Sequence, residues 1–218
     1  MNLLRLAACA LACALSFEPD VAGAATGLDP AFEAQAPSAA AHQVAKWIAT
    51  TDDNRALPFA IVDKTGARLF VFAADGRLVG ATPALLGQAL GDFSVPGIGE
   101  RPLSQVRPHE RITPAGRFVS EPGRHVSGEA VVWVDYDAGV SIHRLRPDRA
   151  EARRRRGLAS ATPADNRLSM GCVVVPEAFF LSVVQPVLGQ RAGVVYVLPD
   201  TVPLQTLFKI DSPVLAQR

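Results

Sequence analysis

The spacing of the apolar residues changes near residue 58. Before it, Ala41, Val44, Ala45, Trp47 and Ile48 repeat at helical spacing, and Ser38 stands ahead of them as a residue type that caps helices. After Pro58 the period becomes two, in short runs rich in Val, Phe and Ile. The pattern predicts a helix from residue 38 to about residue 50, followed by a domain of β-strands.

Turn signals separate these short runs. The predicted strands cover residues 59–63, 68–73, 77–82, 130–135, 140–145 and 193–198, and one more follows a turn at residues 112–118. The stretch 87–111 is rich in Gly and Pro without a period, which predicts an irregular excursion. A second helical apolar face runs from Pro176 to Gly189. Many short strands with few helices favour a mostly-β sandwich or barrel.

The N-terminus has the features of a cleavable signal peptide. Arg5 precedes the apolar run 6–15, and small residues follow at 21–25. We therefore expect secretion to the periplasm or cell envelope, and the run is too short for a membrane span. The predicted division is a signal peptide at 1–25, a flexible leader and helix at 26–57, a folded domain at 58–199 and a tail at 200–218.

The net charge and the cysteine and histidine content limit the classes of function that we expect. The net charge of +1 gives no bulk attraction to nucleic acid. Of three cysteines, Cys9 and Cys13 fall in the predicted signal, so the exported chain keeps Cys172 without a partner for an internal disulfide. No His, Cys and Asp cluster has metal-ligand spacing, and neither a metal nor another cofactor is expected.

Cys172 follows Ser169, Met170 and Gly171 in a turn-forming string ahead of the second helix. Gly171 permits backbone conformations denied to other residues, and N–H groups in such a turn can converge on an oxyanion. The helix N-terminus would favour the thiolate. The alternative is a buried cysteine acting as a small hydrophobe, which the valines at 173–175 favour. From these residues alone, both interpretations stay open.

The presence of His143 favours the interpretation of Cys172 as a catalytic residue over that of a buried structural one. Alternation in residues 140–145 places Ser141 and His143 on one face of a strand. A histidine displayed there could accept the thiol proton and later protonate a leaving amine. Taken alone, such a residue is more often a structural histidine.

His143, then Ser169-x-Gly171-Cys172 and a helix, resemble the signature of the L,D-transpeptidase (YkuD-like) catalytic domain. The runs 60–82 and 113–118 are similar to its earlier segments, so the likeness covers about residues 58–199. The resemblance implies a β-sandwich or barrel enzyme of cell wall biogenesis and cell shape. It also implies that Cys172 attacks a peptidoglycan stem peptide, with the backbone carbonyl of Arg144 orienting His143.

Further expectations follow from the same resemblance. A thioester would form at the third stem residue as D-alanine leaves. An amine would resolve the thioester to a cross-link, whereas water would give L,D-carboxypeptidase activity. Two other hypotheses remain, namely a non-catalytic cell-wall-binding module and an intermolecular disulfide through Cys172. The sequence makes no prediction about oligomeric state.

The chain departs from the family pattern near the cysteine. Met170 replaces the usual histidine, and Val174 stands where Arg or Asn is expected. The separation of His143 from Cys172 exceeds the usual one, which fits an insertion around residues 146–156. This arginine-rich insertion is either a solvated flap or a basic rim that steers anionic polymer to the site.

Three residues ahead of the cysteine complete the predicted site. Asn166 and Arg167 could bind a substrate carboxylate, although an arginine that braces a loop would have the same sequence context. Ser169 is expected to shape the turn by local hydrogen bonding.

Overall fold

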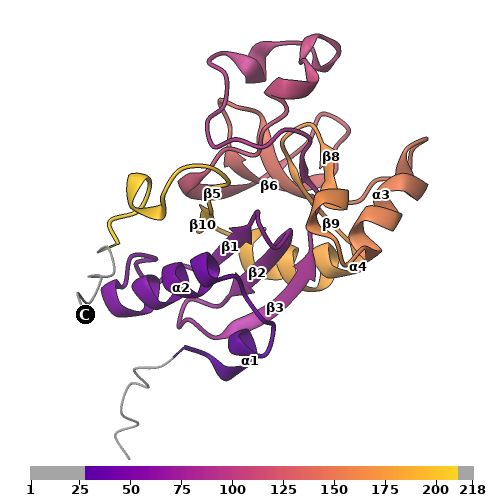
Figure 1. The fold of residues 1–218 in the computed structure, drawn as a ribbon. Helices are drawn as coiled ribbons and strands as arrows, with labels where there is room; N and C mark the ends of the chain where they lie inside the picture. Colours follow the sequence, from indigo (N-terminus) through magenta and orange to yellow (C-terminus); the bar gives the residue numbers. More distant parts are fainter. Residues whose placement is uncertain (1–27, 211–218) are drawn as a thin grey trace, which may run out of the picture.

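The computed structural model describes residues 28–210, so the predicted signal peptide lies outside it. Within this range, eight strands form one sheet in the order β3-β2-β1-β10-β5-β6-β7-β9 (Figure 1). Their bounds are β1 (Phe59–Asp63), β2 (Arg68–Phe72), β3 (Leu78–Pro83), β5 (Gly116–Arg124), β6 (Ala130–Asp135), β7 (Val140–Arg144), β9 (Val173–Val175) and β10 (Gly193–Val197). The mostly-β class predicted from the sequence is confirmed. The ends of β1, β2, β3, β6, β7 and β10 lie within a residue of those expected, β5 follows the predicted turn, and β9 was not predicted.

The two edges of the sheet are drawn together. Leu85 follows edge strand β3 and forms an antiparallel bridge with Val174 of the other edge strand, β9, through hydrogen bonds of 2.8 and 2.9 Å. Beside this bridge, β4 (Leu86–Gly87) pairs in parallel with β8 (Arg167–Ser169). The sheet is thereby nearly closed, which leaves few unpaired edge groups.

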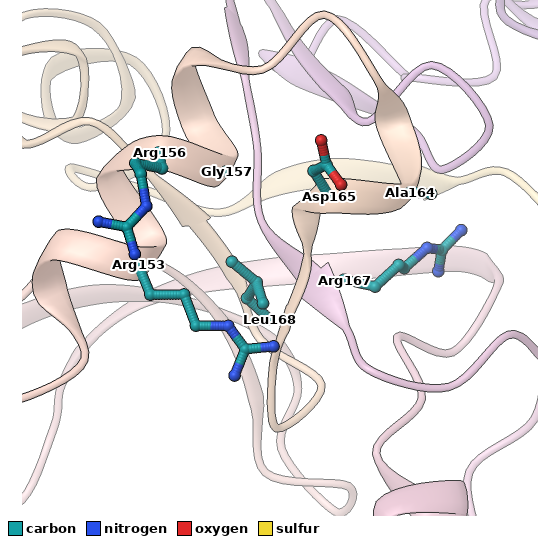
Figure 2. A pocket seen from close by; sticks show the side chains of 7 residues that line it. All are labelled: Arg153, Arg156, Gly157, Ala164, Asp165, Arg167 and Leu168. Carbon is teal, nitrogen blue, oxygen red and sulfur yellow. The ribbon is translucent and has the colours of Figure 1, made fainter.

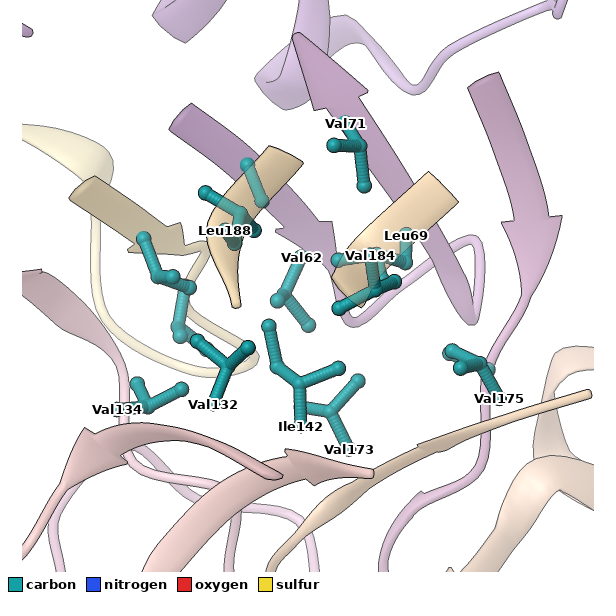
Figure 3. Close-up of a cluster of buried hydrophobic side chains, with 14 of the residues drawn as sticks. Val62, Leu69, Val71, Val132, Val134, Ile142, Val173, Val175, Val184 and Leu188 are labelled. Atoms are coloured by element: carbon teal, nitrogen blue, oxygen red, sulfur yellow. The ribbon is translucent and has the colours of Figure 1, made fainter. Parts of the chain in front are cut away.

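The main core fills the concave side of this sheet. Apolar side chains of β1, β2, β6, β7 and β9 meet those of a helical segment made of α4 (Glu177–Phe179), a π-helical turn (Phe180–Val184) and α5 (Gln185–Leu188) (Figure 3). This segment contributes Phe180, Val184 and Leu188, as its helical apolar spacing predicts.

A second core covers the opposite face of β1, β2 and β10. Helix α2 (Ala39–Thr51) begins as predicted, with Ser38 Oγ accepting a hydrogen bond from the Ala41 N–H at 3.1 Å. Its apolar face packs against Phe59, Phe70 and Tyr196. Because both faces of β1 and β10 are covered, all five residues of each are buried, and apart from Asp63 at the end of β1 and the Tyr196 hydroxyl their side chains are apolar.

The flexible leader expected before α2 is wrong for residues 28–37. A short helix, α1 (Pro30–Glu33), places Phe32 fully buried against the rings of Phe70 and Phe72, with centroids 5.1 and 5.3 Å apart. The Ala- and Pro-rich composition suggested flexibility. One aromatic anchor overrides it because burying a phenylalanine stabilises by about 1.5–3 kcal/mol.

The interpretation of residues 201–210 as a tail is also wrong. Phe208 and Ile210 are buried in the second core, beside Tyr196. Upstream of them, the Asp92 carboxylate accepts hydrogen bonds from the N–H groups of Asp200 at 2.6 Å and Val202 at 2.9 Å. These hydrogen bonds fix the turn after β10 that brings the chain back onto the domain.

The excursion expected at residues 87–111 is irregular from residue 88 onwards, with short 3-10 helices at Ile98–Glu100, Leu103–Gln105 and Pro108–Glu110. They project from one end of the domain (Figure 1). The insertion after β7 forms α3 (Glu151–Ala159) and a 3-10 turn (Pro163–Asn166). Within residues 28–210, no helix has the length and apolar character needed to cross a bilayer.

Candidate active site

Strands β7 and β9 lie side by side and run parallel. Ile142 pairs with Val173 and His143 with Val174, which sets Ser141 opposite Cys172. Ile142 and Val173 point into the main core, whereas Val174 and Cys172 belong to a small cluster on the other face. Because side chains alternate along a strand, Ser141 and His143 share the face of Cys172. The sequence alternation is thus confirmed.

The thiol of Cys172 is partly exposed and free. Its Sγ lies 3.6 Å from the carbonyl oxygen of Gly139 and 3.8 Å from Ser141 Oγ. Leu85, Leu145 and Val174 pack behind it. The Cys172 side chain therefore packs against apolar residues and remains partly exposed to solvent.

His143 is buried on the same strand face as this thiol. Its Nδ1 lies 2.8 Å from the backbone oxygen of Arg144. A carbonyl oxygen only accepts, so Nδ1 carries the ring proton and Nε2 keeps a lone pair. Burial lowers the pKa of His143 to about 4, although the bond to Arg144 opposes this effect, while the positive charge of Arg146 adds to it. At neutral pH the ring is uncharged and can act as a base.

Within the part of the chain that the structure describes, the imidazole makes no hydrogen bond to the thiol. His143 stands two residues beyond Ser141 on the same face, about 7 Å along the strand. Hydrogen bonds between catalytic groups are often long in free enzymes and tighten when substrate binds. The two groups thus share one face of the sheet without a hydrogen bond between them.

The turn before Cys172 is held by Ser169. Its Oγ donates to the Cys172 carbonyl oxygen at 2.6 Å and accepts from the Gly171 N–H at 3.1 Å. Gly171 has a φ of 135°, and a Cβ there would lie 2.8 Å from the Ile112 oxygen. Only glycine fits this position. Met170, between them, is partly exposed.

Two of the predicted substrate-binding residues are engaged within the protein. The Arg167 guanidinium donates to both oxygens of Asp200, at 2.6 and 3.1 Å, and to the Lys64 carbonyl oxygen at 3.2 Å. Asn166 is buried and donates to the Ala84 oxygen at 3.0 Å. These contacts fit the alternative in which Arg167 braces a loop, and both residues tie β8 to the segments beside it.

The side chain of Arg144 points away from the imidazole that its carbonyl holds. It pairs with Glu129 at 2.8 Å and Glu177 at 2.6 Å. Arg144 therefore links β7 to the start of α4, and its backbone rather than its guanidinium contacts His143.

A buried charge cluster was missed by sequence reasoning. Lys64 Nζ is fully buried and donates to Asp92 at 2.9 Å, to the Gly91 oxygen at 2.7 Å and to the Thr113 oxygen at 3.0 Å. Asp200 lies 3.2 Å from the same nitrogen. In the sequence, Lys64 follows a strand and precedes Thr65-Gly66, so it has the appearance of an exposed hairpin residue. No local signal marks it as buried.

The arginine-rich insertion forms one wall of a pocket of about 410 Å³ (Figure 2). Arg153 and Arg156 from α3 line one side, and Asp165 and Leu168 line the other. Figure 2 shows the Arg167 side chain directed away from these two arginines. In residues 28–210, no group of three or more His, Cys, Asp or Glu side chains is placed to hold a metal ion.

Comparison with known proteins gives remote structural neighbours. The L,D-transpeptidase from Xylanimonas cellulosilytica is 18% identical with a TM-score of 0.39, and the match covers 65% of this chain and 60% of that one. The helical cell shape determining protein Pgp2 from Campylobacter jejuni is 18% identical with a TM-score of 0.42, over 69% of this chain and 50% of that one. L,D-transpeptidase 1 from Mycobacterium tuberculosis is 15% identical with a TM-score of 0.36, over 65% and 60%.

This chain thus spans about half to three fifths of the length of these neighbours. No family model and no curated protein matches it. At such identities and TM-scores the neighbours carry no argument about function, which has to come from the residues themselves.

Proposed function

We propose that this chain is an exported cysteine acyltransferase that acts on peptidoglycan stem peptides through a thioester at Cys172. One observation carries the proposal. A partly exposed thiol shares a strand face with His143, whose neutral ring has its Nδ1 proton directed to the Arg144 oxygen. A nucleophile, a base and a group that orients the base are the parts that acyl transfer requires.

The reaction proceeds in two halves. Nε2 of His143 takes the thiol proton, and the sulfur attacks a peptide carbonyl as the π pair moves to oxygen. Collapse of this oxyanion breaks the C–N bond, and the imidazolium protonates the departing amine. A thioester on Cys172 remains. An amine from a second stem then attacks the thioester and restores the thiol, which forms a new peptide bond.

The substrate class comes from the sequence. The string Ser169-x-Gly171-Cys172 after His143 resembles that of L,D-transpeptidases, and the predicted signal peptide would deliver the chain to the cell wall. Water in place of the amine would make the enzyme an L,D-carboxypeptidase or amidase, which remains the alternative outcome at the same thioester.

Intact-mass spectrometry after incubation with a carbapenem tests the mechanism. We expect a covalent adduct on the wild-type protein and none on Cys172→Ala, with His143→Gln forming the adduct much more slowly. His109→Gln is the matched control because His109 is exposed and lies outside the site. An adduct of equal yield on Cys172→Ala would rule out Cys172 as the nucleophile.

Digestion of purified sacculi tests the substrate. Wild-type protein should change the muropeptides, either by adding cross-links or by trimming tetrapeptide stems, and Cys172→Ala should leave them unchanged. Cross-linked products select transpeptidation, whereas tripeptide stems alone select hydrolysis.

A second candidate is a cell-wall-binding module without catalysis. The absence of a hydrogen bond between the thiol and the imidazole in the described residues favours it, as does Met170 in place of a polar residue. Cosedimentation with sacculi that Cys172→Ala does not affect, without any change in muropeptides, would select this candidate.

A further inference from the structure

We infer that Thr113 is a positioning residue for acyl transfer, because its buried hydroxyl orients the Gly171–Cys172 peptide group so that the Cys172 N–H can bind the oxyanion. The inference rests on the proposed function and adds a residue that does not touch the substrate. Thr113 belongs to the Thr-Pro-Ala-Gly segment at residues 113–116, which has no role in the mechanism above.

The Thr113 side chain is fully buried, and its hydroxyl both donates and accepts a hydrogen bond. Its Oγ1 donates to the Gly171 carbonyl oxygen at 2.8 Å and accepts from the Gly87 N–H at 2.9 Å. The carbonyl oxygen of Thr113 in turn accepts from Lys64 Nζ at 3.0 Å. The hydroxyl is therefore fixed in position, and it holds the Gly171 carbonyl towards the protein interior.

The orientation of this carbonyl sets the orientation of the next N–H. The peptide between Gly171 and Cys172 is trans, so its C=O and N–H point in opposite directions. With the oxygen directed at Thr113, the Cys172 N–H points away from the interior side. Ser169 Oγ already accepts from the Gly171 N–H. Within residues 28–210 the Cys172 N–H has no acceptor, and it is the open donor beside the nucleophile.

The turn at Gly171 needs a hydrogen bond from outside the turn to fix its conformation. Gly171 has a φ of 135°, in a region that only glycine populates readily, and glycine also permits its peptide planes to rotate at little cost. A rotation of the Gly171–Cys172 plane would direct the N–H inward and remove the donor. The Thr113 hydrogen bond opposes this rotation because a flipped carbonyl would leave a buried hydroxyl without its acceptor.

Two reactions at Cys172 separate this role from a general structural one. Alkylation by iodoacetamide displaces iodide from carbon and develops no oxyanion. Acylation by a carbapenem passes through a tetrahedral oxyanion. A residue that only maintains the fold affects both rates together, whereas a residue that orients the oxyanion donor affects acylation alone.

The experiment compares Thr113→Val, which keeps the shape and loses the hydroxyl, with Thr113→Ser, which keeps the hydroxyl. Mass spectrometry of the Cys172 peptide measures both rates. We expect Thr113→Val to slow acylation about 10²-fold, the size of effect seen when one oxyanion donor is removed. Alkylation should stay within about twofold, since that step makes no use of the donor. Thr113→Ser should restore acylation to near the wild-type rate.

Ser120→Ala is the matched control, because Ser120 is also a fully buried hydroxyl but lies in β5 without a hydrogen-bond partner in the described residues. It should leave both rates unchanged. Equal slowing of acylation and alkylation in Thr113→Val would overturn the inference, and so would unchanged acylation. If Thr113→Val does not fold, slow acylation in a folded Thr113→Ser overturns it instead. A wild-type protein that is never acylated refutes the proposed function before any variant is compared.

Discussion

In the proposed mechanism, the reactivity of Cys172 depends on two buried side chains of strand β7 that share its face. His143 supplies a neutral ring, and Ser141 places its hydroxyl 3.8 Å from the sulfur. Ser141 is 4% exposed, and the thiol is its only hydrogen-bond partner among the described side chains. Because a buried hydroxyl needs an acceptor, we expect the Ser141 O–H to donate to the sulfur when the thiol ionises.

Ser141→Ala should therefore reduce the reactivity of Cys172. A hydrogen bond to a charged group is worth about 1.5–3 kcal/mol, and a long contact to sulfur lies at or below the lower end, so we expect roughly a threefold to tenfold slower alkylation at pH 7. Iodoacetamide labelling of the Cys172 peptide measures the rate. Ser182→Ala, on the exposed face of the helical segment, should show no change. An unchanged rate in Ser141→Ala would exclude this role.

At the scale of elements, the buried cluster around Lys64 joins four separate segments. Lys64 follows β1, Asp92 lies in the irregular excursion, Thr113 precedes β5 and Asp200 follows β10. Arg167 adds β8 through its ion pair with Asp200. The cluster therefore fixes the segment that contains Thr113 against the turn that contains Cys172, and it does so away from the reacting atoms.

Lys64→Met should destabilise the protein strongly. The substitution leaves the buried Asp92 carboxylate without its cation, and removing one partner of a buried ion pair costs about 3–5 kcal/mol. Urea unfolding followed by circular dichroism measures the free energy of unfolding. Lys46→Met is the matched control, because Lys46 is exposed on α2, and it should change stability by less than about 0.5 kcal/mol. A similar stability for both variants would contradict the role given to the cluster.

At the scale of the whole molecule, stability is linked to pH through two buried groups. Burial lowers the pKa of His143 to about 4 in the folded chain, whereas the usual value of 6.5 applies in the unfolded chain. Between these two pH values the unfolded chain binds a proton on His143 and the folded chain does not. The pKa of Asp92 lies well below its usual range, since hydrogen bonds from Thr201 and Lys64 outweigh the opposing effect of burial. The Asp92 carboxylate stabilises the folded state at neutral pH, and this contribution is lost at low pH. Burial of His143 destabilises the folded state as the pH falls below 6.5, because the unfolded chain then binds a proton that the folded chain does not.

The free energy of unfolding should therefore drop as the pH decreases from 6.5 to about 4. The part due to His143 is at most about 3 kcal/mol, and the loss due to Asp92 follows at lower pH. Urea unfolding at pH 7.0 and at pH 4.5 measures the difference. His143→Gln cannot take up this proton, so its stability should change less between the two pH values than that of the wild type. His109→Gln, at an exposed position, should behave as the wild type does. Equal pH dependence in wild type and His143→Gln would show that His143 is not buried as described.

The sequence by itself determined the features that depend on local spacing. Period-two runs predicted β1, β2, β3, β6, β7 and β10, though not the short strands β4, β8 and β9. Ser38 and the apolar face predicted α2, and alternation placed Ser141 and His143 on one face. These patterns reflect the geometry of single elements, which holds whatever packs against them. Glycine at position 171 was likewise marked as conformationally special, and its φ of 135° agrees.

Only the tertiary structure decided which distant residues meet. Phe32 packs against Phe70 and holds a segment whose composition had suggested flexibility. Lys64 is buried with Asp92, although its place after a strand is typical of an exposed turn residue, and Arg167 pairs with Asp200. The contact between Thr113 and Gly171 joins residues far apart in the chain. Such contacts depend on how strands are ordered and how the sheet closes, which no local period encodes. They arise because a polar group enclosed by the fold must find a partner wherever the fold has placed one.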